Sequence, residues 1–109
     1  MGQFSSKNKM NRVVKAIRLN DHNTIREIIL EADIEVINQF KKQYSINLGS
    51  DYYSIKIRQQ ILVCYIMRYI IDQDIEDAYY LLQDVLYPFL LKFRNLDIQH
   101  VGLYHVMIV

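Results

Sequence analysis

Few residues in this chain have types and spacings that would support chemistry. The single cysteine, Cys64, lies in an apolar run, so we expect a buried and unreactive thiol. His100 and His105 are five residues apart, whereas two metal ligands on one helical face are four apart. The aspartates in residues 72–77 lack the glycine and the terminal glutamate of a calcium loop. The sequence therefore predicts no catalytic residue, no metal site and no cofactor.

The N-terminal segment suggests a different chemistry, covalent lipidation. Gly2 and Ser6 match the N-myristoylation pattern, in which removal of Met1 exposes Gly2. One myristoyl chain holds a membrane only marginally, so a second signal is needed. Five basic residues that precede the first acid would supply it by attraction to anionic lipid: Lys7, Lys9, Arg12, Lys15 and Arg18. In a eukaryotic host this combination predicts a protein on an anionic membrane, and its layout resembles that of a retroviral matrix protein.

Composition favours one soluble helical domain. At 109 residues the chain can enclose a modest core, and its 51% apolar residues would supply that core. One proline and three glycines fit a helical chain, because both residue types break helices. The single cysteine excludes an internal disulfide and favours a reducing compartment, so we expect a cytoplasmic protein. The longest apolar run, residues 61–71, contains Arg68 and is about half as long as a membrane span.

Apolar residues recur at helical spacing through the first half of the chain. Residues 1–8 are polar and predicted to be disordered, whereas residues 9–109 are predicted to form a single helical domain. The first helix is expected to end near Leu19. A second helix is expected to begin at Thr24, which would form a capping box with Glu27. Asp33 is expected to cap a short third helix.

The second half is predicted to begin with the longest helix, residues 52–71, capped by Ser50 or Asp51. This helix is apolar on nearly all sides in its second half, so we expect other helices to surround it. The predicted core residues in it are Ile61, Leu62, Ile66 and Ile70.

The last third is predicted to contain a tight turn at residues 72–74 and a fifth helix over residues 75–87. Pro88 should end or kink that helix, because proline has no amide hydrogen to donate. Residues 89–94 would add a turn or two. Residues 98–109 fit either a strand or a last helix.

The order of apolar and small residues from position 12 to position 93 resembles the CTLH domain and the start of the adjoining CRA motif. The residues that carry the resemblance are Arg12, Ile17, Asn20-Asp21, Gln60, Ile66, Ile70, Asp77-Ala78, Leu82, Leu86 and Pro88-Phe89. The chain departs from the family pattern because Asn20 replaces the usual glycine, no LisH segment precedes Arg12, and the CRA portion is short. The resemblance implies a helical module that binds subunits of a larger assembly, as in ubiquitin-ligase scaffolds.

We therefore predict an all-α bundle of five to six helices that acts as a non-enzymatic protein–protein interaction or scaffold module. Its partner would be another protein or a second copy of the chain. Apolar residues outnumber polar ones from position 86 onward, which predicts an interface that includes Phe89, Phe93 and Tyr104. The alternative is an N-myristoylated membrane-associated protein, and an enzyme is the third class. Nucleic acid is not an expected partner, because no aromatic residues interleave with the basic ones.

Overall fold

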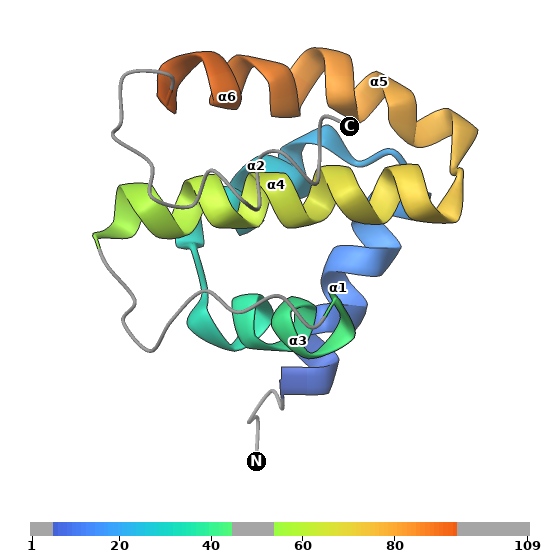
Figure 1. Ribbon diagram of the computed structural model, residues 1–109. Helices are drawn as coiled ribbons and strands as arrows, with labels where there is room; N and C mark the ends of the chain where they lie inside the picture. The colour runs from blue at the N-terminus through green and yellow to red at the C-terminus, as the bar shows by residue number, and fades with distance from the viewer. Residues whose placement is uncertain (1–5, 45–53, 94–109) are drawn as a thin grey trace.

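The computed structural model describes residues 6–44 and 54–93, and within these ranges the chain forms helices joined by short turns (Figure 1). This confirms the predicted all-α fold. The elements in chain order are α1 (Ser6–Arg18), α2 (His22–Glu31), α3 (Ile34–Tyr44), α4 (Ile55–Gln73), the 3-10 turn η1 (Glu76–Ala78), α5 (Tyr79–Leu81), the π-helical turn η2 (Leu82–Leu86) and α6 (Tyr87–Phe93). The predictions for Gly2, for His100 and His105, for Tyr104 and for residues 98–109 lie outside the described residues.

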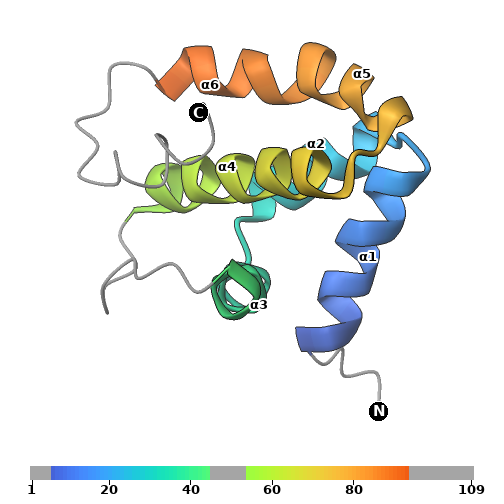
Figure 2. The same cartoon turned by 45° about the vertical axis from the view of Figure 1, so that its right-hand side comes forward.

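The long helix α4 lies at the centre of the fold, with α3 on one side and the continuous helix from η1 to α6 on the other (Figures 1 and 2). It packs against α2, α3, η2 and α6. Helix α1 contacts α2 and α3 and closes the side of the bundle away from α6. The predicted central place of the fourth helix is therefore confirmed.

The core forms around α4 because that helix is apolar on every side over two turns. Every residue from Gln60 to Met67 is buried, and Ile66 and Ile70 are fully inaccessible to solvent. Ile61 and Leu62 are at most 3% exposed. These residues confirm the predicted core of the helix, which starts at Ile55 and not near residue 52, because Ser54 is its N-cap.

An aromatic stack fixes α3 against α4. The rings of Phe40 and Tyr65 lie nearly parallel with their centres 5.2 Å apart. Tyr44 stacks on both, at 6.3 Å from Phe40 and 6.1 Å from Tyr65, and Tyr69 meets Phe40 edge to face. Such offset contacts add to the stabilisation from burial of the rings. Burial, with the Asp72 carboxylate nearby, raises the pKa of Tyr44 to about 12.

The turn between α1 and α2 corrects one predicted cap. Asn20 takes a left-handed conformation with φ of 53°, and the Asp21 amide closes α1 by donating to the carbonyl of Ala16. The N-cap of α2 is Asp21 and not Thr24: its carboxylate accepts from the Thr24 amide at 3.2 Å and from the Thr24 hydroxyl at 2.7 Å. The carboxylate is the stronger acceptor, so the cap lies three residues earlier than predicted and the helix begins at His22.

The remaining helix boundaries follow local hydrogen bonds. The Asp33 carboxylate accepts from the Glu35 amide at 2.8 Å, which confirms Asp33 as the cap of α3. The predicted turn at residues 72–74 is shorter than expected, since α4 continues to Gln73. Asp74 alone adopts the left-handed conformation that ends the helix.

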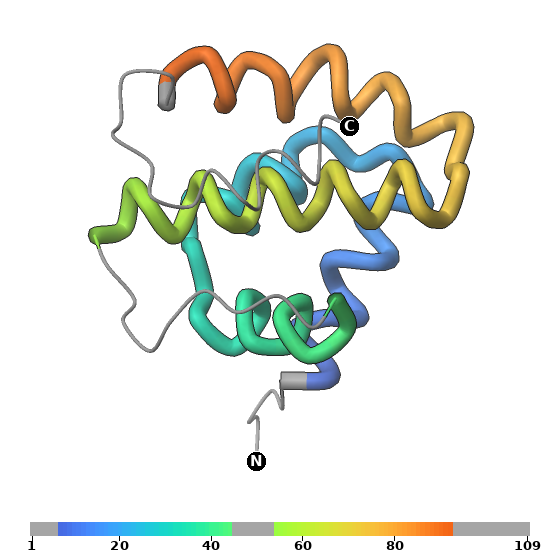
Figure 3. Tube along the Cα trace, viewed as in Figure 1, coloured from blue at the N-terminus to red at the C-terminus, as the bar shows by residue number. Residues whose placement is uncertain are grey.

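The last helix is continuous from η1 to α6, and Pro88 neither ends it nor starts a new one (Figure 3). Its side chains alternate in pairs: residues 81–82, 85–86 and 89 are buried, whereas residues 79–80, 83–84, 87–88 and 91–92 are exposed. A pattern of period four drifts by about 40° per repeat around an α-helix of 3.6 residues per turn. The wider π turn η2, in which the Tyr87 amide donates to the carbonyl of Leu82, reduces this drift at the middle of the helix. Pro88 lies on the exposed side of the helix, where water can reach the carbonyl that has no proline amide hydrogen to accept.

Candidate interaction surfaces

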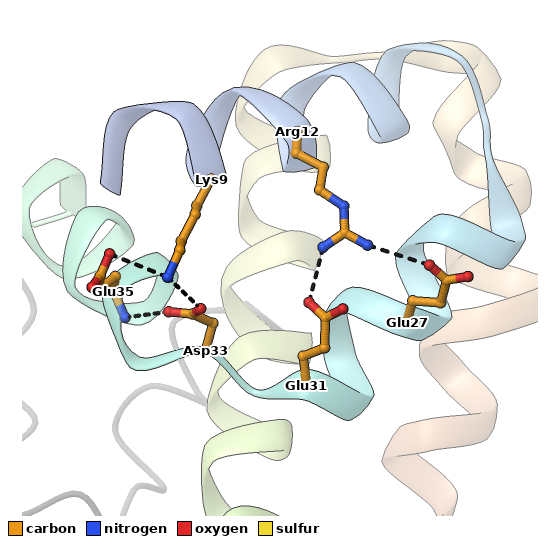
Figure 4. Close-up of polar contacts among 6 residues, drawn as sticks. All are labelled: Lys9, Arg12, Glu27, Glu31, Asp33 and Glu35. Carbon is orange, nitrogen blue, oxygen red and sulfur yellow. Dashed lines mark hydrogen bonds and ion pairs between the residues drawn. The ribbon is translucent and has the colours of Figure 1, made fainter. Parts of the chain in front are cut away.

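Two of the five predicted membrane-binding cations form ion pairs with acidic residues of the same chain. Lys9 Nζ lies 2.9 Å from an Asp33 carboxylate oxygen and 3.3 Å from a Glu35 carboxylate oxygen. Arg12 donates to Glu31 at 2.9 Å and to Glu27 at 3.3 Å. Figure 4 shows both side chains reaching from α1 to the carboxylates of α2 and α3. Glu27, predicted to serve the cap at Thr24, is therefore a partner of Arg12.

The electrostatics of this network favour the charged forms. The hydrogen bond to Asp33 is the main cause that raises the pKa of Lys9. Burial would raise the pKa of Asp33, but the hydrogen bonds from Lys9 and from the Glu35 amide outweigh it, so this pKa lies below its ordinary value. The network thus fixes α1 to the start of α3 and leaves less charge for an external ligand.

The other three cations remain available on α1. Lys7, Lys15 and Arg18 are exposed and make no ion pair within the part of the chain that the structure describes. Their spacing of eight and three residues places them on one side of α1. This exposed basic side, not the whole predicted set, is the candidate surface for anionic lipid.

A groove of about 720 Å³ runs between α1, α2 and the start of α3. Buried apolar side chains at its base include Val13, Ala16 and Ile28. Its lining also includes Lys9, Arg12, Glu31 and Asp33, which are the paired residues of Figure 4. The charged groups of the groove are therefore largely satisfied by one another.

The outer face of the last helix carries a concentration of exposed apolar side chains. We call the eight exposed residues of this helix from position 79 to position 92 the outer face: Tyr79, Tyr80, Gln83, Asp84, Tyr87, Pro88, Leu91 and Lys92. Tyr80, Tyr87 and Leu91 are 60%, 50% and 65% exposed. No described segment covers this side of the helix in either view (Figures 1 and 2), although at its edge the Asp84 carboxylate lies 4.0 Å from the His22 ring of α2. Other large exposed apolar side chains are scattered over the turn after α1, over α2 and over α4: Leu19, Leu30, Ile55 and Ile71.

The interface residues predicted from the sequence are not those of the outer face. Phe89 is 9% exposed and belongs to the core. The side chain of Phe93 and all of Tyr104 lie outside the described residues. Sequence reasoning missed Tyr80 and Tyr87, although the period-four alternation of apolar pairs would have separated them from the buried Leu81, Leu82 and Leu86.

Groups with catalytic potential are few among the described residues. Cys64 is 3% exposed, and its burial raises the pKa of the thiol to about 12, as expected for an inert core cysteine. Residues 6–44 and 54–93 contain no group of three histidine, cysteine or acidic residues placed to hold a metal ion. No helix among them is long and apolar enough to cross a bilayer.

Comparison with known proteins identifies no relative. No family model matches the chain, and neither the curated proteins nor the solved structures give a significant match. The resemblance to CTLH domains therefore stays a prediction from the sequence. Most residues that carry it, among them Ile17, Gln60, Ile66, Leu82 and Leu86, are buried core positions in the structure.

Proposed function

We propose that this chain is a non-enzymatic protein–protein interaction module that binds its partner through the outer face of the last helix. The observation that carries the proposal is the exposure of Tyr80, Tyr87 and Leu91 at 60%, 50% and 65% on a helix whose opposite side is in the core. Tyrosine is enriched in protein interfaces because it covers a large area with little loss of side-chain freedom.

The shape of the outer face favours a helical partner. Its exposed residues fall in two rows, residues 79, 83, 87 and 91 beside residues 80, 84, 88 and 92, and the π turn reduces the rotation between successive members of a row. Rows of side chains on one helix fit the groove between rows on another. The surface is a ridge and not a concave pocket, so it suits a protein better than a small ligand. π turns also occur often at functional sites.

The resemblance to CTLH domains agrees with this proposal and makes it more specific. A CTLH-like chain would serve as one subunit of a larger scaffold, and its role would be to hold other subunits in place. The proposal itself rests on the outer face and does not need the family assignment.

The test compares two leucines of equal exposure. Leu91 lies on the outer face and Leu19 lies after α1, and both are 65% exposed. The wild-type chain, Leu91→Glu and Leu19→Glu are expressed in cells, and native extracts are separated by size. We expect the wild-type chain and Leu19→Glu to elute in an assembly larger than the monomer and Leu91→Glu to elute as a monomer. An unchanged elution of Leu91→Glu would contradict the proposed surface.

A second function, peripheral membrane binding, is favoured by the exposed basic side of α1. We propose that Lys7, Lys15 and Arg18 attract an anionic membrane while an acyl group on Gly2 inserts into it. Each cation contributes about 1 kcal/mol near anionic lipid, and one acyl chain adds marginal affinity. Together the two signals would give a stable but reversible attachment.

The membrane proposal is tested with acylated protein and vesicles that contain phosphatidylserine. Replacing Lys7, Lys15 and Arg18 with glutamine should reduce co-sedimentation with the vesicles. The matched control replaces Arg26, Lys42 and Lys56, which are three exposed cations outside α1. Equal loss of binding in the two triple variants would show that only net charge matters, and no loss in either would refute the role of the basic side.

A further inference from the structure

We infer that the partner at the outer face is a second copy of this chain, bound as an antiparallel twofold pair of last helices. This inference rests on the proposed function and names the occupant of the same surface. The juxtaposition that carries it is a pattern of exposed pairs that reads the same in both directions along the helix.

The pattern is self-complementary about a point between Val85 and Leu86. Reversal of the helix about this point places residues 79–80 opposite 91–92 and residues 83–84 opposite 87–88, so every exposed pair meets an exposed pair. A twofold interface requires this property, because the same patch must serve both subunits. The buried pairs 81–82 and 85–86 remain in the core of their own subunit.

The contacts made in this register are chemically compatible. An antiparallel twofold pair sets each row against the same row of the second copy. Tyr79 then lies opposite Leu91 of the second copy, which buries apolar surface on both sides. Gln83 lies opposite Tyr87 of the second copy, where the amide and the phenol hydroxyl can exchange a hydrogen bond. Each of these contacts occurs twice.

The charges of the outer face also match in this register. Lys92 lies opposite Tyr80 of the second copy, an arrangement in which the ammonium group meets an aromatic ring. In its own subunit Lys92 already lies 5.3 Å from the centre of the Phe89 ring. Asp84 of the second copy is one turn away from Tyr80, about 6 Å along the axis, so each Lys92 comes within reach of an opposite charge. A parallel twofold pair would instead bring the two Asp84 residues to the same level along the axis, and likewise the two Lys92 residues, so that like charges would lie near one another.

The size of the outer face determines how tightly we expect the two copies to bind. The rows from position 79 to position 92 extend for about 20 Å, which is short for a stable dimer interface. We therefore expect a dissociation constant in the micromolar range. The rest of the surface of the bundle need not take part.

The test is sedimentation velocity of the purified full-length chain from about 1 to 200 µM. We expect a monomer–dimer equilibrium for the wild-type chain and for Leu19→Glu. Leu91→Glu should weaken the dimer at least about tenfold, because it places a charge in the apolar contact with Tyr79. Circular dichroism checks that each variant keeps its helices.

Charge exchange tests the antiparallel register itself. Asp84→Lys and Lys92→Glu should each dimerise more weakly than the wild-type chain, because each places like charges next to one another. An equimolar mixture of the two variants should form a heterodimer, since the lysine introduced at position 84 then meets the glutamate introduced at position 92, and the native Lys92 meets the native Asp84. His22 lies 4.0 Å from Asp84 in the same subunit, so His22→Ala serves as a control for that contact.

A wild-type chain that remains monomeric at about 200 µM would overturn the inference. So would a Leu91→Glu variant that dimerises as well as Leu19→Glu, or charge variants that do not associate on mixing. The proposed function is judged separately, because a monomeric purified chain that still enters a larger assembly in cells would mean that the outer face binds a different protein.

Discussion

Truncation of Ile66 should be among the most damaging changes to this fold, because its side chain is fully inaccessible at the centre of α4. Ile66→Ala removes three carbon groups, each worth about 0.8 kcal/mol of transfer free energy, or about 2.4 kcal/mol together. The cavity that remains among the surrounding helices adds to this loss. We expect the free energy of unfolding to fall by about 2–5 kcal/mol.

The matched control is Ile71→Ala on the same helix, where the side chain is 44% exposed. Its cost should stay below about 1 kcal/mol, partly because alanine has the higher helix propensity. Urea denaturation followed by circular dichroism at one fixed protein concentration measures both variants, since association would shift apparent stability. An equal loss of stability in the two variants, or a loss below about 1 kcal/mol for Ile66→Ala, would refute the central position of α4.

Three further predictions concern the caps, the charges and the thiol. Asp21→Ala should lower the melting temperature more than Thr24→Val, because Asp21 accepts both hydrogen bonds at the start of α2; the opposite order in thermal unfolding would restore Thr24 as the cap. Folding lowers the pKa of Asp33. The charged carboxylate therefore stabilises the fold at any pH above the pKa of the unfolded chain, which is about 4, and this stabilisation is lost as the pH falls through the lower pKa of the folded chain. Asp33→Asn, which can still cap α3, should therefore lose less stability than the wild-type chain between about pH 5 and 2, as denaturation midpoints would show, whereas parallel curves would contradict this role. Cys64, with its pKa raised to about 12, should react with a thiol reagent at neutral pH only as fast as the fold opens, and a rapid reaction in the native protein would show that the thiol is accessible.

The core was predictable because helical periodicity and burial are both encoded in the spacing of apolar residues. Ile61, Leu62, Ile66 and Ile70 lie where the sequence placed them. The cap of α2 could not be predicted in this way. Asp21 and Thr24 are both good N-cap residues, and the choice between them depends on the left-handed conformation of Asn20. Local sequence preferences do not contain that geometry.

The surfaces were harder to predict, since exposure depends on contacts between distant segments. Nothing in the sequence pairs Lys9 with Asp33 or Arg12 with Glu31, which are 24 and 19 residues apart. These ion pairs reduce the predicted basic set on α1 to Lys7, Lys15 and Arg18. The extent of the outer face depended on the π turn, because a regular α-helix would have rotated Tyr79 about 120° away from Leu91.

Site-specific photocrosslinking tests the central claim most directly. A photoreactive phenylalanine is placed at Tyr87 on the outer face, and in a separate protein at Leu30 on α2; these side chains are 50% and 55% exposed. The outer face as a binding surface predicts a covalent adduct with a second polypeptide from position 87, no such adduct from position 30, and loss of the adduct when Leu91→Glu is added. Adducts of equal yield from both positions, or none from position 87, would contradict the claim.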